Sequence, residues 1–283
     1  MYIMNNIVYT YTESNISRKF AGFKDELTML TMLALSYNQS KKIAKKVTIY
    51  TNSEFNKLIL SRVVNKDDII VIKDYYDINS KFWALNKLRT CAFVQSSIME
   101  EFYHIDIDFI LWEKLDKIKP KLFVFQEYES FENPKHSHYI MMANEIKNNF
   151  GSLPLRGFAY NCGIMGFRSV IDFEHLIRTA ENFIKDNDYL NYSQFDYNFI
   201  FEQALIANYC PRNETATLTD MKTKFTHLWG NSKNNTSNII RVRGRLENDY
   251  PNYIDVIRDI EENPTQMPSV DMAEMPNIEI LNI

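Results

Sequence analysis

Two aspartates separated by one residue are the sharpest chemical feature of the sequence. They lie in the run His104-Ile-Asp106-Ile-Asp108, at the end of an apolar, β-like segment. On a regular strand alternate residues share a face, so we expect the three polar side chains to point the same way. Two close carboxylates repel each other, and a divalent cation such as Mg²⁺ or Mn²⁺ relieves that repulsion. The alternative is the solvent-facing side of an edge strand, because Asp-x-Asp is a common pattern.

A second candidate lies far downstream, in the run THLWGNSK that begins at Thr226. A glycine such as Gly230 lets backbone N–H groups approach a phosphate, and a lysine such as Lys233 supplies a positive charge for it. His227 precedes both, directly after a short β-like stretch. The pattern suggests a phosphate-binding loop, although the same residue types also form ordinary loops, and a lone histidine is more often structural than a ligand.

Three weaker features could belong to the same site. Asn161 and Gly163 lie in YNCGIMGF, where glycine within a strand indicates a bulge, a tight turn or a ligand close to the backbone. Glu202 and Gln203 lie among aromatic residues in FDYNFIFEQAL, at a pocket margin or facing solvent. Lys87, in FWALNKLR, could reach a phosphate or ribose, although most of that run reads as helix core.

The elements that must position these residues alternate in the first two-fifths of the chain. Runs rich in β-branched and aromatic residues predict strands, and apolar residues at three- and four-residue spacing predict helices. The predicted strands are 7–12, 47–51, 69–72 and 102–110, and the predicted helices are 26–37 and 82–94. Strands that alternate with helices indicate βαβ units and a parallel sheet flanked by helices, as in a Rossmann-like fold.

The second part of the chain is less regular. Its predicted strands are 122–125 and 162–167, and its predicted helices are 139–149, 170–184, 195–209 and 253–260. We expect one α/β domain over 1–245, followed by a C-terminal helix and tail over 246–283. The sequence leaves open whether the tail packs on the body.

Composition narrows the class of protein. With 283 residues, of which 45% are hydrophobic, the chain can bury a large core. The net charge of −4 and the interspersed signs argue against a nucleic-acid-binding surface. The three cysteines match neither a disulfide framework nor a zinc spacing, which favours a reducing compartment. No stretch has the composition of a transmembrane segment or signal peptide, so we expect a cytoplasmic protein.

The order of the motifs resembles that of GT-A glycosyltransferases. The series VTIYTN, FWALNKL, HIDIDFILW, YNCGIMGF, FEQAL and FTHLWGNSK is similar to that of retaining enzymes of the glycogenin and bacterial lipopolysaccharide galactosyltransferase type. It also resembles that of sugar-binding families with a DXD region. The resemblance spans roughly residues 5 to 235, and Asp-x-Asp combined with a distant His-x-x-Gly-x-x-Lys makes it specific. It implies a GT-A fold: a Rossmann-like mixed sheet flanked by helices in a single catalytic domain.

The resemblance also implies roles for individual residues. Asp106, Asp108 and His227 would bind Mn²⁺ or Mg²⁺. The donor, for which a UDP-sugar is favoured, would be bound by a group of residues near the strand ends: Thr10, Tyr11, Lys87, Asn161, Gly163, Gly230 and Lys233. The catalytic residues would be Glu202, Gln203 and Asp196. The acceptor would be a saccharide or another hydroxyl compound, with retention of configuration favoured by the resemblance alone.

Two departures and two rival functions accompany this interpretation. Glu202 stands where the family carries aspartate, and Lys233 lacks the Pro-Trp that follows the lysine in the family. One rival is a GT-A-like module that binds a nucleotide or glycan without transfer, which the glutamate keeps open. The other is a haloacid-dehalogenase-like phosphohydrolase, whose Asp-x-Asp follows the first strand. Here three predicted strands precede the aspartates, so this rival is the weaker one.

Overall fold

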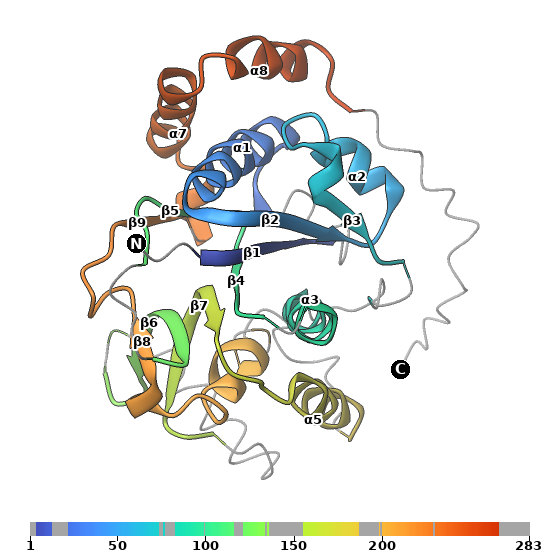
Figure 1. Ribbon diagram of the computed structural model, residues 1–283. Coiled ribbons are helices and arrows are strands. Elements are labelled where there is room, and N and C mark those ends of the chain that lie inside the picture. Colours follow the sequence, from blue (N-terminus) through green and yellow to red (C-terminus); the bar gives the residue numbers. More distant parts are fainter. Residues whose placement is uncertain are drawn as a thin grey trace, which may run out of the picture.

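The computed structural model describes most of the chain in one body (Figure 1). The described residues are 4–12, 22–73, 76, 83–98, 100–115, 121–133, 135, 155–186, 198, 200–228 and 230–265. The helix expected over 139–149 and the C-terminal tail beyond 265 lie outside them.

A seven-stranded mixed sheet forms the centre, in the order β3-β2-β1-β4-β7-β6-β8. Its strands are β1 (Met4–Tyr11), β2 (Ala44–Thr51), β3 (Ile69–Val71), β4 (Phe102–Ile105), β6 (Phe123–Ser130), β7 (Phe158–Phe167) and β8 (Thr215–Thr217). The first four run parallel, and β7 runs antiparallel to both β4 and β6. The Rossmann-like mixed sheet implied by the resemblance is thus confirmed, with the carboxyl ends of β1, β2 and β4 at one edge.

Helices cover both faces of this sheet (Figure 1). On one face lie α1 (Glu26–Ile43) and α2 (Glu54–Leu60), and on the other lie α3 (Trp83–Ile98) and α5 (Phe173–Asp186). Residues of β1 alternate between the two cores: Ile7 and Tyr9 pack with α1, whereas Val8 packs with α3. A central strand buried on both faces reads as an almost continuous apolar run, which explains the composition of β1.

Helix α1 is buried almost all round, because a second layer of helices covers it. Asp25 caps its N-terminus by accepting a hydrogen bond from the Thr28 N–H at 2.7 Å. The outer side of α1 packs against α7 (Thr236–Asp249) and α8 (Tyr253–Glu262) (Figure 1). Residue 245, where we expected the catalytic domain to end, lies within α7.

A second, two-stranded sheet stands apart from the first. It pairs β5 (Phe109–Leu111) with β9 (Phe225–His227) in antiparallel register, and we call it the ribbon. All three residues of β5 are buried, and Ser36 of α1 donates a hydrogen bond to Phe109 O at 2.5 Å. The ribbon is therefore anchored in the core beside α1.

Most of the predicted elements are present in the structure. The three N-terminal strands and both early helices are confirmed, as are the later strands and the helices at 170–184 and 253–260. Of the helix expected over 195–209, Asn198 is helical and Ile200–Ala204 forms a π-helical segment. Helices α2 and α7 were not predicted.

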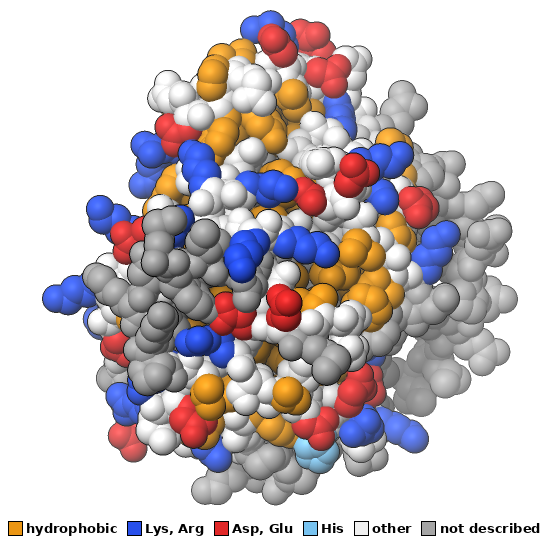
Figure 2. Space-filling model, in the orientation of Figure 1, with side chains coloured by type: hydrophobic (Ala, Val, Ile, Leu, Met, Phe, Trp, Pro, Cys, Tyr) orange, Lys and Arg blue, Asp and Glu red, His pale blue; other side chains and the backbone are white. Residues whose placement is uncertain are grey.

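One face of the molecule carries both signs of charge side by side. Figure 2 shows Lys and Arg side chains interspersed with Asp and Glu among the coloured atoms of the face in view. Such a mixture differs from the continuous basic surface that binds nucleic acid. Among the described helices, none has the length and apolar character needed to cross a membrane.

Candidate metal centre

The two aspartates lie where the chain passes from the main sheet to the ribbon. Strand β4 ends at Ile105 and β5 begins at Phe109. Between them the backbone turns: the Phe109 N–H donates to Asp106 O at 3.0 Å, and the Asp106 N–H donates to Gly163 O at 3.0 Å. The prediction of one continuous strand is therefore wrong, because the turn moves the chain into another sheet before the second aspartate.

His104 does not share a cluster with the aspartates. Its Nε2 lies 2.8 Å from Thr10 Oγ1, which also bonds to Thr90 Oγ1 at 2.7 Å. Burial, and then the Lys87 ammonium, hold the pKa of His104 well below its usual value, so the ring is neutral. The expected common face for the three polar residues is thus corrected, because alternation applies only while a strand continues.

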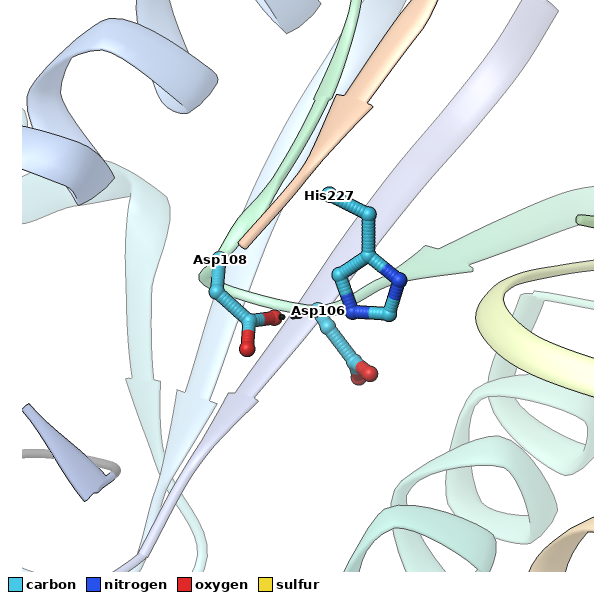
Figure 3. A group of neighbouring side chains, drawn as sticks. All are labelled: Asp106, Asp108 and His227. Carbon is cyan, nitrogen blue, oxygen red and sulfur yellow. Dashed lines mark ion pairs between the residues drawn. The ribbon is translucent and has the colours of Figure 1, made fainter. Parts of the chain in front are cut away.

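The ribbon brings His227 to the aspartates from the far end of the chain. His227 pairs with Phe109 across the ribbon, and the Leu228 N–H donates to Asp108 O at 2.9 Å. One ligand atom from each of Asp106, Asp108 and His227 lies within 4.8 Å of the other two. Figure 3 shows the three side chains converging, with one imidazole nitrogen toward the carboxylates and the other on the side away from them.

The donor set suits a divalent cation. Two carboxylates and one imidazole provide oxygen and nitrogen ligands, a combination that Mn²⁺ accepts more readily than Mg²⁺. His227 Nε2, the nitrogen nearer the carboxylates, is 3.6 Å from Asp108 Oδ1. The residues therefore fit the metal that the resemblance implies, and they share the sheet edge where ligands bind in open α/β folds.

Two lysines neutralise the aspartates. Lys87 Nζ lies 2.7 Å from Asp106 Oδ1, and Lys233 Nζ lies 2.6 Å from Asp108 Oδ2. Burial would raise the pKa of Asp108, but the Lys233 ammonium and the His227 ring bring it well below its usual value. Burial prevails at Asp106 and raises its pKa. A cation entering this centre would compete with the two ammonium groups for the same oxygens.

Lys87 also joins the centre to Glu202. The side chains of Lys87 and Glu202 are 4% and 2% exposed, and they form a buried ion pair. Lys87 Nζ also donates to Cys162 O at 2.6 Å. Burial would lower the pKa of Lys87, but the carboxylates of Asp106 and Glu202 raise it, so the ammonium stays charged. Lys87, expected to reach a donor phosphate, is here engaged by carboxylates of the protein itself.

Gly163 lies directly under the imidazole of His227. A Cβ atom at this glycine would lie 2.9 Å from His227 Cε1 and Nδ1, and too close to Gln126 Oε1. Only glycine therefore leaves the ring its position. Asn161 Oδ1 accepts a hydrogen bond from the Gly163 N–H at 3.2 Å, and its Nδ2 donates to Glu129 Oε1 at 3.2 Å. The Asn-x-Gly pair thus forms the wall of the centre beside the histidine.

Gln126 is a residue of this wall that the sequence analysis missed. The register between β6 and β7 shifts between Phe125 and Glu127, so Gln126 is the bulged residue of β6. Bulges re-aim side chains and are frequent next to active sites. Its only signal in the sequence is a polar residue that closes an apolar run, LFVFQ.

The structure describes the elements that carry three further expected residues. Tyr11 and Gln203 are buried, at the end of β1 and in the π-helical segment. Gly230 has a φ of 54° and begins the short 3₁₀ helix that contains Lys233. Asp196 lies outside the described residues, so its place relative to Glu202 is not given by the structure.

Comparison with known proteins gives a family match in sequence and similarities in fold. A family model described as a family of unknown function, DUF6734, matches residues 1–219. This range includes both aspartates and ends before the ribbon strand that carries His227. No protein of curated function matches the chain.

Several solved glycosyltransferase structures resemble the chain. GlyE of Streptococcus pneumoniae is 12% identical over 78% of this chain and 46% of its own, with a TM-score of 0.36. The bifunctional WbbM is 10% identical over 76% and 39%, with a TM-score of 0.40. An enzyme involved in glycosylating the major capsid of PBCV-1 is 9% identical over 85% and 99%, with a TM-score of 0.42. The chain thus spans less than half of the first two proteins. Because all three TM-scores lie below 0.5, the chemistry has to be argued from the side chains.

Proposed function

Because the chain belongs to DUF6734, a family of unknown function, we propose its activity from the geometry of the metal centre: a metal-dependent glycosyltransferase that uses a nucleotide-diphosphate sugar. The observation that carries the proposal is the convergence of Asp106, Asp108 and His227 within 4.8 Å. Lys233 stands beside them and can meet a diphosphate. The motif series of the sequence supports sugar transfer over other reactions of phosphate esters.

The chemistry requires stabilisation of a leaving diphosphate. When the bond between the anomeric carbon and the diphosphate oxygen breaks, negative charge builds on that oxygen. A divalent cation bound by Asp106, Asp108 and His227 would supply Lewis-acid stabilisation of this charge. Lys233 contributes a further positive charge once its ammonium leaves Asp108 for a phosphate oxygen.

Glu202 and Lys87 are proposed to act on the sugar side of the centre. Lys87 holds Asp106 and Glu202 in fixed positions. Asn161 and Gly163 are proposed to line the sugar side of the site, as the resemblance implies. Gln203 and Asp196 complete the catalytic set implied by the resemblance. We propose a UDP-sugar donor, Mn²⁺ as the metal, a hydroxyl acceptor on a saccharide and retention of configuration, as in the enzymes that the motif series resembles.

One observation favours a second candidate, a binding protein without transferase activity. The Glu202 carboxylate is engaged by Lys87 and is 2% exposed, so it is not free to contact a reacting carbon as it stands. Such a protein would bind the nucleotide-sugar with metal but would not turn it over.

A panel of nucleotide-sugars tests both candidates. Release of nucleoside diphosphate is measured with Mn²⁺, with Mg²⁺ and with EDTA, and donor affinity is measured by calorimetry in the same buffers. A transferase releases diphosphate from one donor only when metal is present, whereas metal-dependent binding without release identifies the second candidate. Donor binding of equal affinity in EDTA would remove the metal from the proposal.

The Asp108→Asn variant separates chemistry from stability. We expect this change to abolish turnover and metal-dependent donor binding, because it removes an anionic ligand. The melting temperature should fall only in part, because the amide loses the ion pair with Lys233 but also removes repulsion with Asp106. A large loss of stability with retained turnover would return Asp108 to a structural role.

A further inference from the structure

Two buried polar atoms beside the metal centre have no hydrogen-bond partner among the described residues. They are Gln126 Oε1 and His227 Nδ1. Both are among the nearest atoms to the point where a Cβ of Gly163 would lie, so they face the same small space. A buried polar atom without a partner destabilises the fold, so two of them facing one space call for a physical reason.

The backbone aims Gln126 at this space. Its position at the bulge of β6 removes it from the regular alternation of the strand. The Thr219 N–H and hydroxyl both donate to Gln126 O at 3.2 Å, which fixes the bulge from the β8 side. The side chain is 6% exposed and therefore sits within the protein rather than in solvent.

The position of the proton on the His227 ring explains why these two atoms face the same space. A histidine that binds metal through Nε2 is neutral and carries its proton on Nδ1, and that N–H needs an acceptor. In this structure Nε2 faces Asp108, while Nδ1 lies on the opposite side of the ring (Figure 3). We propose that Gln126 is the positioning residue of the metal centre: its Oε1 accepts the Nδ1–H of His227 when Nε2 takes the metal.

This inference rests on the metal centre of the proposed function and assigns a role to a residue outside the ligand set. An amide oxygen is a neutral acceptor, so it selects the Nδ1–H tautomer without adding a third negative charge near Asp106 and Asp108. Gly163 is part of the same arrangement, because any side chain there would stand between Gln126 and His227. The contact also explains why a glutamine is buried in β6.

The test compares Mn²⁺ binding by variants of one residue. Partners of this kind contribute about 10–100-fold to metal affinity, and we expect a Kd for Mn²⁺ weakened by about that factor in Gln126→Met, measured by calorimetry on the full chain. Gln126→Glu keeps an acceptor oxygen and adds a negative charge, so it should bind Mn²⁺ at least as well as the wild type. Gln95→Met is the matched control, because Gln95 lies on α3 and bonds to the backbone of Ile171, away from the centre.

A second readout separates positioning from general destabilisation. Pulsed electron paramagnetic resonance of bound Mn²⁺ reports the nitrogen coupling of the His227 ring, which we expect to be lost or altered in Gln126→Met and kept in Gln126→Glu. If Gln126→Met fails to fold, Gln126→Asn, which shortens the reach by one methylene, serves in its place. A folded Gln126→Met with wild-type Kd and nitrogen coupling would overturn the inference alone, whereas a wild-type chain that binds no Mn²⁺ would overturn the metal centre and this inference together.

Discussion

At the scale of single residues, the centre consists of charges that compensate one another. Asp106, Glu202 and Lys87 form one group, and Asp108 with Lys233 forms another. Lys87 is buried and serves two carboxylates at once. Its removal would leave Glu202 buried without a counter-charge, which is the costly way to break such a pair.

We therefore expect Lys87→Met to reduce the free energy of unfolding by about 3–5 kcal/mol. Urea unfolding measures the change. Arg89→Met is the control on the same helix, because Arg89 pairs with the partly exposed Glu181 and should contribute about 1 kcal/mol or less. The double change Lys87→Met with Glu202→Leu should recover part of the loss, since apolar replacement of a whole buried pair is often nearly neutral. Equal effects of the two single changes would contradict this account.

At the scale of elements, local patterns predicted the parts that local interactions determine. The strands β1, β2 and β3 and the helix α1 follow from β-branched runs and apolar spacing in their own residues. Helix α7 was missed because it has only two buried residues, Val242 and Leu246, and Gly244 interrupts its middle. Its cap at Asn235, which accepts from the Ser237 and Asn238 N–H groups, is a signal that could have revealed it.

The sequence predicted which residues form the candidate site better than it predicted how they are arranged. The motif order brought Asp106, Asp108 and His227 into one hypothesis, and the structure places them together. The break after Ile105 could not be read from the sequence, because residues 102–110 alternate as one strand would. The break depends on pairing with β9, a contact between distant parts of the chain. Lys87 and Glu202 are likewise far apart along the chain, so local patterns could not predict their ion pair.

The second layer of helices is expected to stabilise the whole fold. Leu246 of α7 is fully buried in the core that contains α1, whereas Ile240 of the same helix is 65% exposed. Leu246→Ala should therefore cost about 2–5 kcal/mol of unfolding free energy, while Ile240→Ala should leave it within about 0.5 kcal/mol. Chemical denaturation compares the two variants. A Leu246→Ala protein as stable as the wild type would show that α7 adds little to the fold.

At the scale of the whole molecule, the sheet divides the interior into two cores. One holds α1, the ribbon, α7 and α8, and the other holds α3, α5 and the antiparallel strands. The cysteines Cys91, Cys162 and Cys210 are free and all belong to the second core. Burial raises the pKa of each thiol, which keeps all three protonated and shielded from reagents. We propose that the protein works in a reducing compartment, where such thiols persist.

This burial predicts the reactivity of the thiols. With iodoacetamide at pH 8, the native protein should stay unmodified, although an accessible thiol with a pKa of about 8.5 would react readily. In guanidinium chloride all three cysteines should be alkylated, and intact mass spectrometry counts them. Labelling of one thiol in the native protein, at the rate seen in the denatured one, would show that the second core opens.

The ribbon has a consequence for the order in which the molecule can be made. Synthesis starts at the N-terminus, so β5 leaves the ribosome well before β9, its pairing partner in the ribbon. Until then β5 is an apolar edge strand, of the kind that invites pairing with another chain. The arrival of β9 covers that edge and supplies His227 in the same event. An unfinished chain thus exposes this apolar edge and lacks His227, so the candidate metal site is complete only once this late segment has been made.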